Sequence, residues 1–175
     1  KLTIPSGDYP TVFSYLRSFG VLSTVKFERL ITSSTFDLSA GQKKHLEEFF
    51  DFPKGLLKHI GQDTTRNIEI LKRLEIECQI DDNKKIIFFG ASIEQSMFIC
   101  SLLIYLGFNA AHLDGSTDIG LRQKILKDFI DGDLQIICNY GILSTGFDAP
   151  KTNLVFIARP TKSIVLYSQM IGRGL

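Results

Sequence analysis

From residue 84 onward, the sequence alternates short apolar runs with amphipathic helical patterns, and this alternation constrains the fold most strongly. The continuous apolar run at 86–89 is typical of a strand buried on both faces of a parallel sheet. Three further strands are predicted, at 109–113, 134–138 and 154–158. Strands that alternate with helices form βαβ units with right-handed crossovers. The sequence therefore predicts an α/β domain with a parallel sheet and helices on both of its faces.

The predicted helices have start and stop signals of their own. Ser92 is the expected N-cap of the first helix, with Gln95 in the capping-box position, and Gly107 ends that helix. The second helix ends at Gly132 and carries four apolar residues on one predicted face: Leu121, Ile125, Leu126 and Phe129. Either Thr161 or Ser163 is expected to cap a last helix.

Residues 1–83 have a less regular pattern and are expected to form an irregular, partly helical segment before the sheet. Asp63 or Thr64 is the expected cap of its last helix. Pro53 and two glycines favour a connecting turn over 51–61. The other predicted elements are a strand end at 1–4, an extended segment at 22–31 and helices at 11–19, 37–50 and 64–77.

Composition excludes some classes of protein. The formal net charge is only +1, so bulk charge does not predict nucleic-acid binding. Cys78, Cys100 and Cys138 are far apart and show no metal-ligand spacing, so we expect buried small apolar residues. Neither a signal-peptide pattern nor an apolar run near the ~20 residues of a membrane span is present. We therefore expect a cytoplasmic protein without a membrane partner.

Three polar loops follow predicted strands, at 90–92, 114–117 and 139–150. In open α/β sheets, ligands bind beyond the carboxyl ends of the strands, where these loops lie. The third loop is rich in glycine and hydroxyl side chains, as expected near a phosphate or a sugar. Taken singly, each loop is better explained as an ordinary βα turn with capping residues.

The last predicted helix carries Gln169 and Arg173, which are four residues apart and share one face. An arginine suits a phosphate because its charge is permanent and its donors match two oxygens at once. The simpler alternative is a surface salt bridge for Arg173 and a solvated Gln169.

Three segments together resemble the motifs of superfamily-two helicases. Residues 86–92 resemble motif IV, 141–150 resemble motif V, and 167–175 resemble motif VI in its Gln-x-x-Gly-Arg-x-x-Arg form. Their variant forms are similar to a bacterial DEAD/DEAH-box branch related to the helicase subunits of restriction enzymes. The resemblance covers 84–175 strongly and 1–83 weakly.

This resemblance implies a C-terminal, RecA-like motor domain at 84–175, truncated at motif VI. Residues 1–83 would then be the end of motor domain one and a helical connector. ATP and Mg²⁺ would bind between two such domains, mainly through the missing one, and a nucleic acid would lie across both.

The resemblance also implies roles for individual residues. Arg173 would act as an arginine finger on the γ-phosphate, with Gln169 supporting it as a second catalytic residue. Gly146 and Asp148 would bind the nucleotide together with Arg173. The implied contacts to the nucleic-acid backbone come from Ser92, Ser116, Thr117, Thr145, Arg159 and Thr161.

The chain contains no GxxxxGK[ST] loop and no Asp-Glu magnesium pair, both of which belong to the first motor domain. The second arginine of motif VI would fall one position after Leu175. This stretch alone is therefore expected to be inactive. Expected partners are DNA rather than RNA, the N-terminal motor domain, and nuclease or methyltransferase domains or subunits.

Two other functions remain open at this point. The chain could be a non-catalytic nucleic-acid-binding module with a helicase-like fold, although an intact Arg173 disfavours this. It could also be a small-molecule enzyme such as a nucleotide-sugar transferase. That alternative needs a glycine-rich turn after the first strand, and residues 90–92 do not have the GxGxxG pattern.

Overall fold

The computed structural model describes residues 15, 18, 25–143 and 152–174. Within them, four strands form one parallel sheet in the order β2-β3-β1-β4, which confirms the predicted sheet. Their bounds are β1 Lys85–Phe89, β2 Ala110–Leu113, β3 Ile136–Asn139 and β4 Thr152–Ile157.

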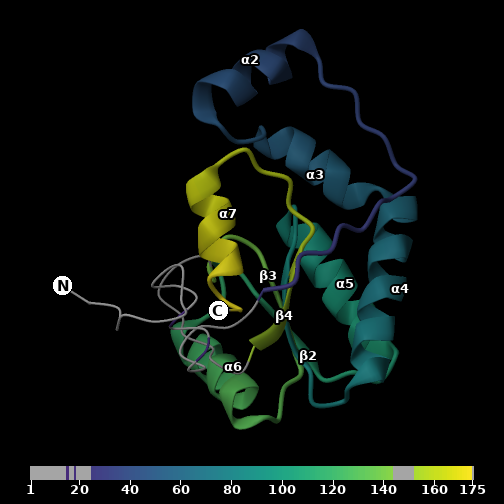
Figure 1. Ribbon diagram of the computed structural model, residues 1–175, viewed down its shortest axis with the longest axis vertical. Coiled ribbons are helices and arrows are strands. Elements are labelled where there is room, and N and C mark those ends of the chain that lie inside the picture. The colour runs from purple at the N-terminus through teal and green to yellow at the C-terminus, as the bar shows by residue number, and fades with distance from the viewer. Residues whose placement is uncertain (1–14, 16–17, 19–24, 144–151, 175) are drawn as a thin grey trace, which may run out of the picture.

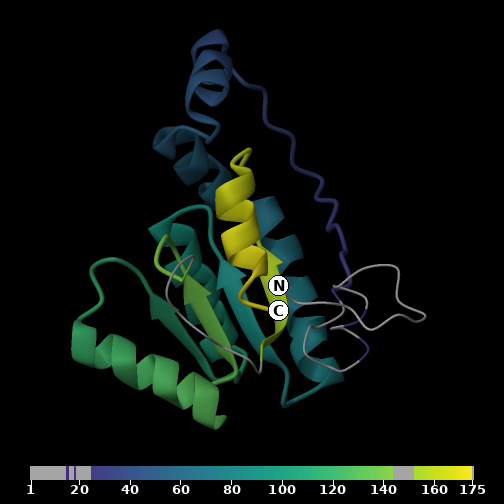
Figure 2. The same ribbon diagram turned by 60° about the vertical axis from the view of Figure 1, so that its left-hand side comes forward.

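Helices cover both faces of this sheet, as predicted. Figures 1 and 2 show α4 and α5 on one face, α6 and α7 on the other, and α2 and α3 stacked beyond one end of the strands. The bounds of the helices are α2 Ala40–Phe49, α3 Lys54–Gln62, α4 Thr64–Ile80, α5 Ile93–Tyr105, α6 Ile119–Asp131 and α7 Ile164–Ile171.

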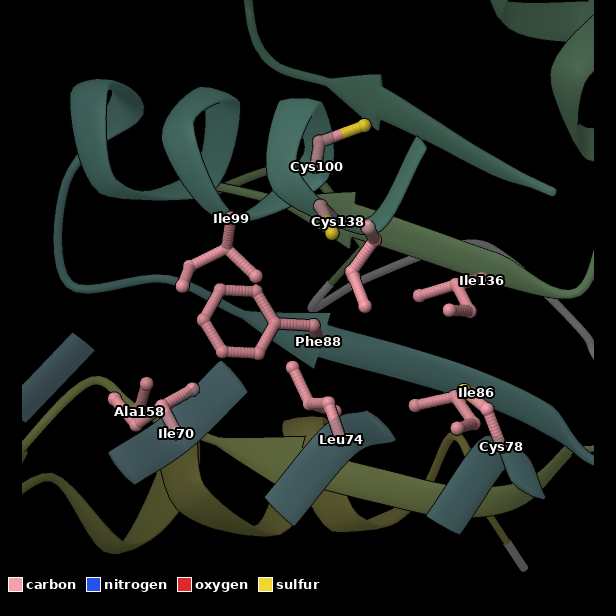
Figure 3. Close-up of a cluster of buried hydrophobic side chains, with 11 residues drawn as sticks. Ile70, Leu74, Cys78, Ile86, Phe88, Ile99, Cys100, Ile136, Cys138 and Ala158 are labelled. Atoms are coloured by element: carbon pink, nitrogen blue, oxygen red, sulfur yellow. The ribbon is translucent and has the colours of Figure 1, made fainter. Parts of the chain in front are cut away.

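The side chains of β1 alternate between two cores, because successive residues of a strand point to opposite faces. Ile86 and Phe88 pack beneath α4 and α5, whereas Ile87 and Phe89 pack against α6 and α7. All five residues of β1 are buried, as expected of a central parallel strand. Figure 3 shows Phe88 enclosed between Ile99 and the side chains of α4.

Helix α4 belongs to the core of the sheet, although it lies in the predicted connector. Its residues Ile70, Leu74 and Cys78 are buried in the same cluster as Ile86 and Phe88 (Figure 3). The other two cysteines lie in this cluster too, so all three cysteines are free and buried. Residues on both sides of the predicted domain boundary between 83 and 84 thus share one hydrophobic core. The boundary itself remains a prediction.

The connecting turn predicted at 51–61 is wrong, because α3 occupies most of it. Pro53 is the N-cap of α3, where its missing N–H costs no intrahelical hydrogen bond. The turn prediction rested on Pro53 and two glycines. It overlooked the apolar stripe of Leu56, Leu57 and Ile60, all of which are buried.

The predicted helix caps are largely confirmed. Asp63 accepts a hydrogen bond from the backbone N–H of Arg66 and caps α4. Ser163, rather than Thr161, caps α7. On α6, three of the four predicted core residues pack inward, but Leu121 is exposed because it lies in the first turn of the helix, away from the sheet. Among the described helices, none is long and apolar enough to cross a membrane.

Two glycines of α3 provide a matched test of packing at its junction with α5. A Cβ on Gly61 would lie 2.9 Å from Ser92 Oγ and 3.1 Å from Gln95 Cβ, whereas a Cβ on Gly55 would meet nothing within 4 Å. We expect Gly61→Ala to lower the free energy of unfolding by about 1–3 kcal/mol, since the helix must move away from α5. Gly55→Ala should raise it by about 0.5–1 kcal/mol through helix propensity. Urea denaturation of both variants measures the difference, and equal effects would contradict the tight junction.

Candidate nucleotide and nucleic-acid site

The polar loops predicted as ligand sites lie at one edge of the sheet, because parallel strands place their carboxyl ends on the same side. The loop after β1 begins at Gly90, the loop after β2 at Asp114, and the segment after β4 at Ala158. Helix α3 covers part of this edge, since Gly61 lies directly against Ser92.

Ser92 caps helix α5 and is buried. Its Oγ accepts a hydrogen bond of 3.1 Å from the backbone N–H of Gln95, and only 6% of the residue is exposed. Its neighbour Glu94 forms a salt bridge of 2.6 Å with Lys58 of α3. The hydrogen bond from Lys58, followed by bonds from the backbone and from Ser92, lowers the pKa of Glu94 to about 2. The Ser92 hydroxyl is therefore engaged within the protein.

A chain of buried side-chain amide hydrogen bonds connects α3 and α4 to the loop after β1. Gln95 Oε1 accepts from the backbone N–H of Ala91 at 2.7 Å, and Gln95 Nε2 donates to Asn67 Oδ1 at 2.7 Å. Asn67 Nδ2 in turn donates to the carbonyl of Gly61 at 2.8 Å. Gln95 thus bonds to Ala91 rather than completing the predicted capping box on Ser92. Sequence reasoning missed Asn67, whose only signal is a polar residue at a buried position of α4.

The loop after β2 is organised around the carboxylate of Asp114, which is 5% exposed. Asp114 Oδ1 accepts from the backbone N–H of Ser116 at 2.7 Å and from its hydroxyl at 2.6 Å. Asp114 Oδ2 accepts from His112 Nε2 at 3.1 Å. The Ser116 hydroxyl bond, with the bonds from His112 and the Ser116 backbone, lowers the pKa of Asp114 to about 2 despite its burial.

The partners of His112 determine its tautomer. An ionised carboxylate only accepts hydrogen bonds, so Nε2 carries the proton that is donated to Asp114. Nδ1, which lies 2.9 Å from the hydroxyl of Ser96, then accepts from that hydroxyl when the ring is neutral. Ser96 is fully buried in α5. This Ser-His-Asp chain therefore connects α5 to the loop after β2, and it offers no exposed nucleophile.

The two hydroxyl groups of this loop differ in whether their O–H is free to donate a hydrogen bond outward. The O–H of Ser116 donates to Asp114. Thr117 Oγ1 instead accepts from the backbone N–H of Asp114 at 3.0 Å, so its own O–H can point outward. Arg122 closes the loop through 3.4 Å contacts to the carbonyls of Asp114 and Thr117.

The segment after β4 places Arg159 in a partly buried cluster. Its guanidinium forms an ion pair with Asp51 and lies 5.6 Å from the centroid of the Tyr140 ring. Arg66 of α4 donates to the carbonyl of Ala158 at 2.6 Å. Sequence reasoning predicted Arg159 but missed Asp51 and Arg66, which come from distant parts of the chain.

Of the two predicted catalytic residues, Gln169 lies in the last turn of α7, whereas Arg173 lies two residues beyond Ile171, where the helix ends. Both Gln169 and Arg173 are partly exposed, and Arg173 Nε donates to the main-chain carbonyl of Gln169 at 3.2 Å. Thr161 Oγ1 accepts from the backbone N–H of Ser163 at 3.0 Å and so supports the N-terminus of α7. Helix α7 is fixed to the sheet by Met170, which is 1% exposed.

Three predicted residues, Thr145, Gly146 and Asp148, lie outside the described residues. Over 25–143 and 152–174, no group of three or more His, Cys, Asp or Glu side chains has the arrangement of a metal site. A polar pocket of about 410 Å³ lies at the opposite, amino-terminal edge of the sheet, near Lys85 and Asn153. The strands direct their carboxyl ends away from this pocket, so it lies apart from the loops where open α/β sheets bind ligands.

The profile of the helicase conserved C-terminal domain family matches residues 66–175. A 51.5 kDa protein of a Lactococcus phage (isolate 7-9) is 33% identical over 94 residues, which are 54% of this chain and 21% of that protein. The putative ATP-dependent helicase IRC3 of Saccharomyces cerevisiae is 30% identical over 125 residues, covering 71% of this chain and 18% of that protein. The chain thus spans about a fifth of these relatives.

Solved structures agree with the fold. The crystal structure of the Pyrococcus furiosus Hef helicase domain superposes with a TM-score of 0.53 and 27% identity, covering 67% of this chain and 25% of that one. Domain 2 of the DEAD-box helicase Mss116p, bound to an RNA duplex, gives a TM-score of 0.55 at 20% identity, covering 61% of this chain and 43% of that one. The second likeness concerns the RecA-like fold alone.

Proposed function

Because the chain belongs to the helicase conserved C-terminal domain family, we propose that it is the second motor domain of an ATP-dependent DNA helicase or translocase. The observation that carries this proposal is the placement of Arg173. It is partly exposed two residues beyond the carboxyl end of α7, a helix that packs on the RecA-like sheet through Leu166 and Met170. A guanidinium held in this way can reach a phosphate bound by another domain.

In this mechanism a preceding motor domain binds ATP and Mg²⁺, and closure of the two domains brings Arg173 to the γ-phosphate. Its charge stabilises the negative charge that develops on the phosphoryl oxygens during hydrolysis. Gln169, whose carbonyl holds Arg173 Nε, positions the guanidinium. Gly146 and Asp148 are proposed to contact the edge of the nucleotide.

The nucleic-acid strand is proposed to cross the loops at the carboxyl edge of the sheet. Its backbone would contact hydroxyls and N–H groups that fix its position without reading bases. The proposed direct contacts are Thr117, Thr145, Arg159 and Thr161, whereas Ser92 and Ser116 are proposed to hold their loops in shape, because their hydroxyls are engaged within the protein. The resemblance to restriction-enzyme helicase subunits supports DNA as the polymer, and a nuclease or methyltransferase as a partner.

Thr117 and Ser116 provide a matched test of this strand path. Thr117→Val keeps the shape of the side chain but removes the whole hydroxyl, both the O–H that can point outward and the acceptor of the Asp114 backbone N–H. We expect the Kd for single-stranded DNA to rise about three- to tenfold. Ser116→Ala removes only an internal donor to Asp114 and should change that Kd less. Fluorescence anisotropy of the full-length protein with labelled DNA measures both constants, and the reverse order would contradict the assignment of Thr117.

The proposed function is tested by the steady-state ATPase rate of the full-length protein. The rate is measured without nucleic acid and then with single-stranded DNA, duplex DNA and RNA. Strong stimulation by DNA supports the proposal, and stimulation by RNA alone overturns the choice of polymer. No ATPase under any condition would favour the alternative of a non-catalytic nucleic-acid-binding module.

A further inference from the structure

Arg159 has an incomplete set of hydrogen bonds in the partly buried cluster after β4. Its Nη2 donates to Asp51 Oδ2. The Nε of Arg159 lies on the same edge of the guanidinium, yet it is buried and has no partner among the described residues. Asp51 Oδ1 is likewise buried and has no described partner. The two side chains thus form one bond where an arginine and an oxyanion commonly form two.

The surroundings of Arg159 favour an anion. Arg66 approaches from α4 and bonds to Ala158, the residue immediately before Arg159. The Nη1 of Arg66 is also buried without a partner among the described residues. Asp63, the N-cap of α4, accepts from the Arg66 backbone N–H and from Ser34 and is the acid that acts on the Arg66 guanidinium. The cluster after β4 therefore contains two guanidinium groups with unsatisfied donors, and Asp51 supplies the counter-charge of Arg159.

The segment that carries Asp51 has a strained backbone. Phe50, directly before Asp51, has a φ of 54° and is the only described non-glycine residue with a positive φ. This left-handed conformation is disfavoured for a bulky side chain. The Phe50 side chain is also 63% exposed, so it adds little packing to hold the segment. Phe50 is the C-cap of α2, so Asp51 lies in the link between α2 and α3 rather than within a helix.

We propose that Arg159, with Arg66 beside it, binds a phosphate oxyanion, and that Asp51 is an intramolecular anion that occupies this site until the phosphate displaces it. This proposal rests on the proposed function. Nucleic-acid backbones and nucleotides both supply such an oxyanion. The Tyr140 ring centroid lies 5.6 Å from the Arg159 guanidinium, within the range of a cation–π interaction.

The test measures DNA binding by the full-length protein. If Asp51 competes with the phosphate, removing its charge lowers the Kd for DNA; if Asp51 only forms a structural salt bridge, removing it does not. Asp51→Asn removes the competing charge, and we expect the Kd for labelled single-stranded DNA, without nucleotide, to fall about three- to tenfold. Asp82→Asn is the control, since it removes one exposed acid at the opposite edge of the sheet. Arg159→Ala should raise the Kd about tenfold and lower the salt dependence by about one phosphate contact.

Further variants distinguish a phosphate of the nucleic acid from a phosphate of the nucleotide, and they control for a variant that fails to fold. In the double variant Asp51→Asn with Arg159→Ala, the gain from Asp51→Asn should disappear. Arg159→Lys should not restore affinity, because lysine has no fork. A lower KM for ATP with unchanged DNA affinity in Asp51→Asn would assign the site to the nucleotide. Asp51→Ser provides a second variant if Asp51→Asn melts at a lower temperature.

The proposal is overturned if Asp51→Asn and Asp51→Ser bind both DNA and ATP as Asp82→Asn does. If the wild-type ATPase is still stimulated by DNA, that result would rule out the phosphate site at Arg159 but not the proposed motor function. An ATPase rate of the wild-type protein that no nucleic acid raises would instead contradict the proposed function itself.

Discussion

Replacing Arg173 with alanine is expected to reduce the ATP turnover of the full-length protein by about 10³-fold or more. The affinity for ATP should change little, because in the proposed mechanism the other motor domain holds most of the phosphates. The kcat is measured at saturating ATP and DNA, and ATP affinity is measured with a fluorescent nucleotide. The physical reason is that the guanidinium contributes most when charge develops on the transferred phosphoryl group.

Two further variants make this expectation specific. Arg173→Lys should restore little activity, since lysine provides a point charge and no planar fork. Lys162→Ala, which removes an exposed cation ahead of the same helix, should retain nearly normal kcat. Near-normal turnover in Arg173→Ala would remove this residue from the active site.

Asp114→Asn is expected to lower the free energy of unfolding by about 2–4 kcal/mol. The carboxylate accepts three hydrogen bonds, from His112 Nε2 and from the backbone and hydroxyl of Ser116. An amide in the same place presents an NH₂ group to at least one of these donors. Since the loop also carries Thr117, DNA affinity should fall in the same variant. Urea denaturation and DNA-binding anisotropy measure the two effects.

Asp114 also predicts a pH dependence. Its pKa is about 2 in the folded chain against an ordinary value of 3.8. A lowered carboxyl pKa stabilises the folded state above the unfolded value, and this contribution is lost as the pH falls from about 4 towards 2. The difference corresponds to about 2 kcal/mol. The wild-type chain should lose this stability on acidification, whereas Asp114→Asn should lack that component. An identical acid response of the two proteins would contradict the role of the carboxylate.

The sequence predicted the sheet because its signals are local. The apolar run of β1 and the caps at Ser92 and Asp63 are readable within a few residues. Helix α3 was missed because turn-forming residues hid a buried stripe that is stabilised by tertiary packing on Ala91. In such cases burial overrides local propensity.

The contacts that organise the site could not be predicted, since they join distant residues. Asn67 and Gln95 are 28 positions apart, and Asp51 and Arg159 are 108 positions apart. No periodicity or motif relates such pairs. The predicted phosphate contacts also gave no indication of which hydroxyls are already engaged, and Ser92 and Ser116 prove to be engaged within the protein.

The proposed motor couples ATP hydrolysis at Arg173 to movement along DNA. This coupling is measured as ATP-dependent displacement of streptavidin from biotin-labelled DNA by the full-length protein and its Arg173→Ala variant. We expect displacement by the wild type with ATP only, and none by the variant although it still binds the DNA. Equal displacement by both proteins, or DNA binding and ATP hydrolysis by the wild type without displacement on either single-stranded or duplex DNA, would contradict it.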